Sequence, residues 1–385
     1  MRKLFTAARL LNGSQIFTDP VLLVEDDRIV SIASRADAPL PTGLAVEDFA
    51  DATFAPAFFD VHIHGAAGHD VMEATPAALR TITRYLATRG TGSFLATTVT
   101  APLDATLRAV EGLANLIEAP HTPGHARPIG IHLEGPFLSH EKRGVQPPEH
   151  LLEPSIATFN RLYDAARGHI RLITLAPELP GAAEFTAHAA SRGVRVSLGH
   201  SNATAAETRA AIAAGAASAT HTFNAMRALD HREPGILGVV LTTPSLYAEL
   251  ICDGIHTAPE MVRLWRSAKG PERAILVTDA MSAAGMPDGE YQLGGFTVQV
   301  AHGRAMARGV LAGSVLTLDR ALTNYIAFTG ASLEESLPLL TANPAAMTGL
   351  AASAGSLAPG SHANFVVLEN TGQLRASVLD GRLAA

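Results

Sequence analysis

The chain has 385 residues, of which 47% are hydrophobic, and this is enough for one large domain and a small one. Its formal net charge of -7, without a long basic run, excludes the electrostatic pattern of nucleic-acid binding. The single cysteine permits no disulfide within the chain, and no apolar stretch reaches about 18 residues. We therefore expect a cytoplasmic protein without a membrane span.

Two patterns divide the chain. Residues 1–53 alternate short apolar segments with turn residues, which is typical of antiparallel strands. From residue 54 onward, apolar strand-like runs alternate with alanine-rich stretches of helical pattern. The helical stretches include 76–90, 103–118, 149–167 and 204–214. The strand-like runs are 54–65, 92–100, 128–136, 169–178, 194–201, 216–224, 246–254 and 273–280.

Eight β units separated by helices predict a (β/α)8 barrel of the TIM type over residues 54–349. An open doubly wound sheet would be expected to carry a glycine-rich phosphate loop after its first strand, and none follows. After the eighth run, residues 289–310 predict a β-hairpin insertion, and two helical runs come next. The chain then returns to short strands, so we expect residues 1–53 and 350–385 to pair into one small β-sandwich domain.

The first apolar run, "FFDVHIHG", places Asp60, His62 and His64 at alternate positions, so they share one face of the predicted strand. Two imidazoles at this spacing can bind one cation, although alternating polar residues also occur on half-exposed strands. Other predicted strands end on polar residues too, and in a barrel these ends meet at one cavity. Imidazole and carboxylate groups suit zinc, iron(II) or manganese. The other polar residues at strand ends are Glu134, Glu178, His200, His221, Asp253, His256 and Asp279.

Eight short motifs follow one another from residue 60 onward: "DVHIHG", "HLEGPF", "GHSNAT", "HTFNAM", "HREPG", "DGIH", "TDA" and "LAGS". In this order they resemble the N-acetylglucosamine-6-phosphate deacetylase family of the amidohydrolase superfamily. That resemblance implies a barrel flanked by a small β-sandwich. It also implies hydrolysis of N-acetyl-D-glucosamine 6-phosphate to D-glucosamine 6-phosphate and acetate, a reaction of amino-sugar catabolism and recycling.

The resemblance further implies a metal centre. Glu134, His200 and His221 match the family's principal metal site. His62 and His64 match the His-x-His of a second site, so one or two divalent ions per subunit are expected, with Glu134 as the bridge. Zn2+ is the first expectation, with Fe2+, Mn2+ and Co2+ as alternatives. If only one ion is held, His62 and His64 would bind solvent or substrate instead.

The same resemblance implies roles in catalysis and substrate binding. A divalent cation lowers the pKa of its bound water toward about 7 and so supplies hydroxide. Asp279 matches the family aspartate that deprotonates this water and returns the proton to the departing amine, and His256 matches the histidine beside the acetyl carbonyl. Binding of the phosphate falls to Asn224, Ala225 and Arg232, with the arginine reaching in from the neighbouring subunit of a homodimer.

One departure from the family pattern concerns sugar recognition. Members usually carry a histidine in the loop after "HLEGPF", where this chain has Gln146. Glutamine still forms hydrogen bonds with a sugar hydroxyl but carries no charge, so deacetylation of N-acetylgalactosamine 6-phosphate or another N-acyl amino sugar stays open. A cyclic-amide hydrolase is disfavoured because the fourth strand lacks a lysine. A non-catalytic binding protein is disfavoured because all the metal ligands are retained together with Asp279.

Overall fold

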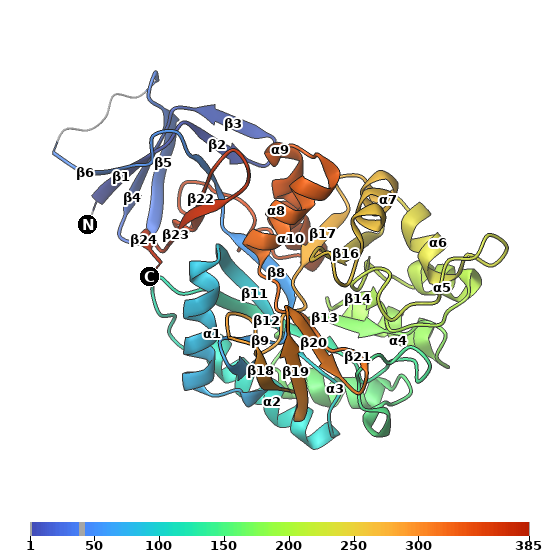
Figure 1. Cartoon of the computed structure of the whole chain (residues 1–385). Coiled ribbons are helices and arrows are strands. Elements are labelled where there is room, and N and C mark those ends of the chain that lie inside the picture. Colours follow the sequence, from blue (N-terminus) through green and yellow to red (C-terminus); the bar gives the residue numbers. More distant parts are fainter. Residues whose placement is uncertain (1, 38–42, 385) are drawn as a thin grey trace.

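The computed structural model describes residues 2–37 and 43–384, and its largest sheet is a parallel barrel (Figure 1). Its eight strands lie in the order β17-β16-β15-β14-β13-β12-β11-β8, so strands that follow one another in the chain are neighbours. A parallel bridge between Ile63 and Ala280 joins the first strand to the last. The barrel strands are β8 Phe58–Ile63, β11 Thr91–Thr98, β12 Arg127–Glu134, β13 Ile170–Leu175, β14 Arg195–Leu198, β15 Ser218–Ala219, β16 Tyr247–Ile251 and β17 Ala274–Val277.

A helix follows each barrel strand in the chain, and the helices surround the barrel in Figure 1. An amphipathic helix such as α2 buries an apolar stripe, which here contains Val110 and Leu113. None of the described helices is long and apolar enough to cross a membrane. The helices are α1 Pro76–Thr88, α2 Leu103–Glu118, α3 Ile156–Ala165, α4 Ala182–Ser191, α5 Ala205–Ala213, α6 Gly235–Thr242, α7 Pro259–Lys269 and α8 Leu318–Thr329. The predicted (β/α)8 barrel is thus confirmed.

Several elements are shorter than the sequence pattern predicts, and two of them differ most. The helix expected over 149–167 begins only at Ile156, because Pro154 disfavours helical geometry before it and the Ser155 hydroxyl caps the new N-terminus. The strand expected over 216–224 is only β15, Ser218–Ala219. The residues after β15 leave the sheet and turn into the mouth of the barrel.

An antiparallel sheet of four strands, β18 to β21, interrupts the chain between β17 and α8, where a hairpin was predicted. Its strands are β18 Gly289–Leu293, β19 Phe296–Ala301, β20 Arg304–Ala307 and β21 Val310–Leu311. Leu293, Val310 and Leu311 line the cavity described below, so the insertion forms part of one wall of that cavity. The remaining short elements are β9 Gly65–Ala66, β10 His69–Asp70, η1 Val71–Glu73, η2 Pro148–His150, α9 Leu333–Ser336, η3 Leu337–Leu340 and α10 Ala342–Thr348.

Strands from both ends of the chain form a smaller unit of two sheets, in the orders β5-β4-β1-β6 and β24-β23-β22-β7-β2-β3 (blue and red in Figure 1). Their facing sides share a core in which the ring of Phe365 lies 4.9 Å from that of Phe54 and 5.1 Å from that of Phe5, centroid to centroid. The strands are β1 Arg2–Thr6, β2 Arg9–Asn12, β3 Gln15–Thr18, β4 Pro20–Glu25, β5 Arg28–Ser34, β6 Ala45–Asp48, β7 Thr53–Pro56, β22 Phe365–Leu368, β23 Leu374–Leu379 and β24 Arg382–Leu383.

The predicted architecture, a second and smaller β domain built from both ends of the chain, is therefore confirmed. Its expected limits, 1–53 and 350–385, stay a prediction. β7 crosses the first limit and pairs with β2 and β22 of the terminal sheet.

A cluster of imidazoles and carboxylates joins the two units. The buried Asp380 accepts hydrogen bonds from His121 Nε2 (2.9 Å) and from the Gly124 amide (3.1 Å), both on the barrel side. Nδ1 of His362 lies 3.1 Å from carboxylate oxygens of both Asp27 and Asp380. The Arg127 guanidinium faces Nε2 of this imidazole at 3.3 Å, and arginine can only donate, so the proton of the neutral ring is on Nδ1. The two units are therefore linked by polar contacts, most directly by the hydrogen bonds of His121 and Gly124 to Asp380.

We predict that Asp380→Asn loosens this junction. Burial alone would raise the pKa of Asp380, but the hydrogen bonds from His121 and Gly124 outweigh burial and hold this pKa below its usual value. The variant should lose about 2 kcal/mol of unfolding free energy at pH 7, the usual size for hydrogen bonds to a charged group. Because the folded pKa is lowered, this stabilisation is present above the unfolded pKa of about 3.9 and is lost as the pH falls through the folded value.

Urea unfolding followed by circular dichroism at several pH values measures this difference. The gap between wild type and variant should be full at pH 7 and close below about pH 4. A gap of the same size at every pH would contradict the assignment.

Candidate metal centre

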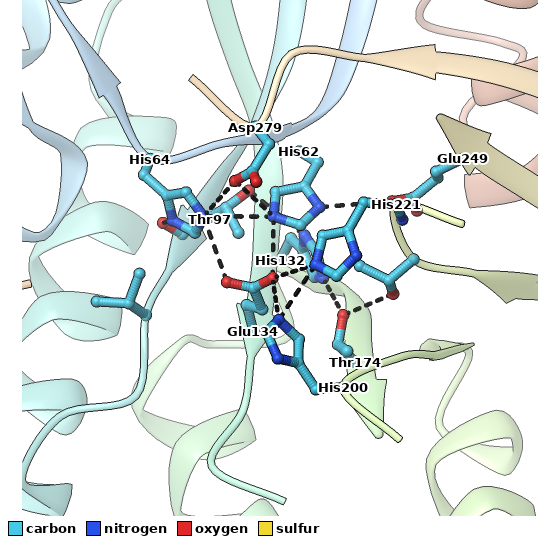
Figure 2. A network of polar contacts seen from close by, with 12 residues as sticks. His62, His64, Thr97, His132, Glu134, Thr174, His200, His221, Glu249 and Asp279 are labelled. Carbon is cyan, nitrogen blue, oxygen red and sulfur yellow. Dashed lines mark hydrogen bonds and ion pairs between the residues drawn. The ribbon is translucent and has the colours of Figure 1, made fainter. Parts of the chain in front are cut away.

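The polar residues predicted at the strand ends meet at one end of the barrel, because the carboxyl ends of parallel strands all face the same way (Figure 2). His62 lies on β8, His64 directly follows it, and Glu134 ends β12. His200, His221 and Asp279 each lie two residues beyond the end of β14, β15 and β17. A cavity of about 260 Å³ opens onto this group.

The backbone at these positions is strained. His200, His221, Ala225 and Asp279 all have positive φ angles, of 47°, 27°, 51° and 50°. Residues with a Cβ rarely adopt this left-handed region, and such strain gathers at functional sites. At each of these strand ends the chain turns sharply and directs the residue into the barrel mouth instead of continuing along the sheet.

Glu134, His200 and His221 form one compact group of ligand atoms. Oε1 of Glu134 lies 3.1 Å from Nε2 of His200 and 3.1 Å from Nε2 of His221. The two Nε2 atoms lie 3.1 Å from each other. These three side chains are buried, and together they can hold one metal ion.

His62, His64 and Asp279 form a second group that can hold a metal ion. Nε2 of His64 lies 3.1 Å from Oδ1 of Asp279 and 3.3 Å from Nε2 of His62. Glu134 lies between the two groups: its Oε1 is 3.3 Å from Nε2 of His62, and its Oε2 is 3.3 Å from Nε2 of His64. One carboxylate therefore contacts all four imidazoles.

Two of the four imidazoles have their second nitrogen held in the way that a metal ligand needs. Nδ1 of His64 lies 3.0 Å from the Thr97 carbonyl, and Nδ1 of His200 lies 3.0 Å from the Lys142 carbonyl. A carbonyl only accepts, so each Nδ1 carries a proton, and whenever these rings are neutral the lone pair of Nε2 points at the centre. Lone pairs that converge in this way repel one another unless a cation or a proton lies between them, so the donor set fits a divalent metal.

The electrostatics of the centre favour positive charge on the imidazoles. Burial alone would lower the pKa of His64, but Asp279 and Glu134 raise it to about 9. Burial opposes the charge of Glu134 and Asp279 as well, yet the facing imidazoles hold the pKa of both carboxyl groups below its usual value. The two buried carboxylates thus attract positive charge, which either protons or metal ions can supply.

Asp60 and His132 support the centre from behind and belong to neither group. Asp60 accepts a hydrogen bond from the Thr278 hydroxyl (2.6 Å), which ties β8 to the end of β17, and burial raises the pKa of Asp60 to about 7. Burial keeps the pKa of His132 well below its usual value, so this ring is neutral. It packs edge-on against the ring of His62 with centroids 4.7 Å apart.

Most of the residues that were predicted to bind the substrate lie in the wall of the cavity. Asn224, Ala225, His256 and Gln146 line the cavity. Nδ1 of His256 donates to Asp253 (2.6 Å), and this hydrogen bond raises the pKa of the imidazole although burial opposes it.

Gln146 and Arg232 differ from the other predicted substrate residues in their surroundings. Both ends of the Gln146 amide bind inside the protein, since Oε1 accepts from the Thr100 amide (2.9 Å) and Nε2 donates to Glu134 (2.7 Å). Arg232 is exposed, and it is absent from the described lining of the cavity.

Two glutamates serve the site in ways that the motifs do not reveal. Glu178 accepts hydrogen bonds from the Ser201 hydroxyl (2.7 Å) and the Asn202 amide (2.6 Å), which fix the loop after His200. Glu249 is fully buried on β16 beside His62. The signal for Glu249 in the sequence is one acidic residue inside the apolar run "LYAELIC", which has no structural reason to hold a charge.

Comparisons with known proteins agree with this geometry. The model of the amidohydrolase family matches residues 53–383. An N-acetylgalactosamine-6-phosphate deacetylase of Escherichia coli O157:H7 is 38% identical and covers 100% of both chains. An N-acetylglucosamine-6-phosphate deacetylase of Vibrio furnissii is 34% identical over 98% of this chain and 94% of its own.

Among solved structures, a mutant N-acetyl-D-glucosamine-6-phosphate deacetylase from Mycobacterium smegmatis, in complex with N-acetyl-D-glucosamine-6-phosphate, has a TM-score of 0.92. It is 34% identical and covers 100% of this chain and 99% of that chain. The barrel, the two ligand groups at its mouth and these likenesses converge on one conclusion. The chain belongs to the amidohydrolase family.

Proposed function

We propose that this protein hydrolyses the acetamide bond of N-acetyl-D-glucosamine 6-phosphate and releases acetate and D-glucosamine 6-phosphate. The observation that supports this most is the Glu134 carboxylate between two groups of ligand atoms, with Asp279 beside it at the barrel mouth. The Mycobacterium smegmatis relative, with the same fold over its whole length, was solved with this phosphorylated sugar bound.

The proposed metal ligands are the two groups described above. Glu134, His200 and His221 would hold one divalent cation, and His62 and His64, which lie beside Glu134 and Asp279, would hold a second. Zn2+ suits this set of imidazoles and carboxylates, and Fe2+, Mn2+ and Co2+ are the alternatives. When bound, such a cation polarises the amide carbonyl and makes a water molecule more acidic.

In this proposal Asp279 transfers the proton, and His256 stabilises the negative charge that develops on the substrate. The lowered pKa of Asp279 keeps it ionised near neutral pH, so it can accept the proton of the attacking water. It then returns this proton to the nitrogen of the sugar, which leaves as an amine. Asp253 holds Nδ1 of His256, which leaves Nε2 for the oxygen of the acetyl group, where negative charge develops.

The phosphate of the substrate requires cationic or N–H donors at the other end of the cavity. We assign Asn224 and Ala225 to this role because both line the cavity and the backbone at Ala225 has the left-handed conformation. We also propose a homodimer in which Arg232 serves the site of the neighbouring subunit. Arg232 is exposed and lies outside the described cavity of its own chain, which favours a contribution across an interface.

A second candidate substrate is N-acetylgalactosamine 6-phosphate. Gln146 stands where the family pattern has histidine, it lines the cavity, and its amide contacts the bridging Glu134. The Escherichia coli relative named for the galactosamine sugar is 38% identical. The two sugars differ in the configuration of one hydroxyl group, and we assign discrimination between them to the wall that contains Gln146.

The direct test is acetate release from a panel of both N-acetylhexosamines, with and without 6-phosphate, by protein of measured metal content. We expect the phosphorylated glucosamine derivative to have the highest kcat/KM. Its advantage over the unphosphorylated sugar should be about 10- to 100-fold, the size of a lost charged contact. Preference for the galactosamine derivative would select the second candidate. No acetate from any sugar by metal-loaded protein would contradict the deacetylase proposal.

We predict that Asp279→Asn keeps the fold and removes most of the activity. The amide has almost the same shape but cannot accept the proton of the attacking water, so kcat should fall by about 10²- to 10⁴-fold. Metal content must be measured alongside, because Asp279 also belongs to a ligand group. An unchanged kcat at unchanged metal content would exclude Asp279 as the base.

We predict that Arg232→Ala raises KM for phosphorylated sugars by about tenfold or more and leaves the unphosphorylated sugars unaffected. Mixing this variant with Asp279→Asn tests whether the site is shared. A mixed dimer contains one subunit with Asp279 intact whose partner supplies an intact Arg232, so activity should recover. A mixture that stays as weak as its components would show that Arg232 acts within its own chain or not on phosphate at all.

A further inference from the structure

The four imidazoles of the centre differ in what holds their second nitrogen. Backbone carbonyls accept from Nδ1 of His64 and His200. Nδ1 of His221 has no hydrogen-bond partner among the described residues. Nδ1 of His62 instead lies 3.4 Å from Oε2 of Glu249, which makes His62 the imidazole whose second nitrogen faces a carboxylate (Figure 2).

Glu249 has no other purpose that the structure shows. It lies on β16 between Ala248 and Leu250, and all three residues are fully buried. Its Oε2 also lies 3.5 Å from the His221 amide, and its Oε1 has no hydrogen-bond partner among the described residues. Barrel interiors are usually filled by branched apolar side chains, and a buried carboxyl group is costly without partners. A glutamate at this position therefore points to a role at the centre.

The surroundings of His62 explain why a carboxylate is needed there. Its Nε2 faces Oε1 of Glu134 at 3.3 Å and Oδ1 of Asp279 at 3.5 Å. These two acceptors would attract the ring proton to Nε2, and an Nε2–H group cannot bind a cation. An acceptor on the opposite side of the ring is required to keep the proton on Nδ1.

We propose that Glu249 is a positioning residue that fixes the ring proton of His62 on Nδ1, and that it thereby sets the affinity of the His62–His64–Asp279 group for a divalent cation. The inference rests on the metal centre of the proposed function. It adds that occupancy of the second site is controlled from β16, a strand that contributes none of the proposed metal ligands. Glu134, His200 and His221 should bind their cation nearly as well without Glu249, since its one contact to that group is the long one to the His221 amide.

The test compares Glu249→Leu, which removes the acceptor, with Glu249→Gln, which keeps an oxygen acceptor without the charge. Zn2+ binding to metal-free protein is titrated against a chromophoric chelator. Wild type should bind two ions per chain. The leucine variant should bind its second ion about 10- to 100-fold more weakly, as is usual when a partner behind a metal ligand is lost. The glutamine variant should show a smaller loss, and the first ion should be nearly unaffected in both.

A second readout concerns the imidazole itself. Nitrogen-15 NMR of metal-free protein, at a pH high enough for the ring of His62 to be neutral, should show its Nδ1–H tautomer in the wild type and its Nε2–H tautomer in the leucine variant. Asp380→Asn is the matched control, because it alters a buried carboxyl group that belongs to neither ligand group of the centre and should keep both ions. A merely structural role of Glu249 would lower thermal stability without moving the tautomer.

Three outcomes would overturn the proposal: a wild type that binds only one Zn2+, an unchanged second affinity in Glu249→Leu, or an unchanged tautomer in that variant. If Glu249→Leu does not fold, Glu249→Gln decides, and an affinity for the second ion equal to that of the wild type would overturn the proposal. These measurements use no substrate. A failure of the sugar panel would therefore contradict the proposed function and leave the role of Glu249 standing.

Discussion

The architecture of the barrel mouth depends on the carboxylate of Glu134. Its two oxygens lie within 3.3 Å of Nε2 atoms of His62, His64, His200 and His221, which come from the ends of three strands, β8, β14 and β15. A buried carboxylate without positive charge beside it would be strongly destabilising, so these imidazoles and the cations they can bind are required where Glu134 is. The reverse also holds, because imidazoles whose lone pairs converge need a cation or protons between them. The centre is therefore stable only when the carboxylate, the imidazoles and the positive charge between them are all present.

Closure of the barrel serves the same centre. The Thr278 hydroxyl at the end of β17 donates to Asp60 on β8, and the Asp279 amide donates to the His62 carbonyl (2.9 Å). These bonds bring the last strand against the first, so Asp279 and His64 lie within reach of each other although more than 200 residues separate them. The left-handed backbone at His200, His221 and Asp279 is tolerated because neighbouring strands and the buried network hold it in place.

Groups that contact the second nitrogen of the imidazoles complete the site. Backbone carbonyls orient two imidazoles, Glu249 faces a third, and Asp253 holds His256. Gln146 binds the Glu134 carboxylate itself, so the loop residue that departs from the family pattern also borders the candidate metal centre. A substitution of Gln146 would therefore disturb the carboxylate that all four imidazoles contact.

The sequence by itself determined the order of strands and helices in the barrel and the strand-end positions of the candidate ligands. Both follow from local periodicity: strand alternation places His62 and His64 on one face, and βα alternation places Glu134, His200 and His221 at one end. Only the tertiary structure decided which polar residues touch. Asp60 shares the strand face of the two histidines, yet barrel closure pairs it with Thr278, and Glu249 becomes part of the site because curvature brings β16 behind His62. Alternation along a strand specifies the side on which a residue lies, whereas contact across a barrel depends on strand tilt, register and sharp turns that no local pattern encodes.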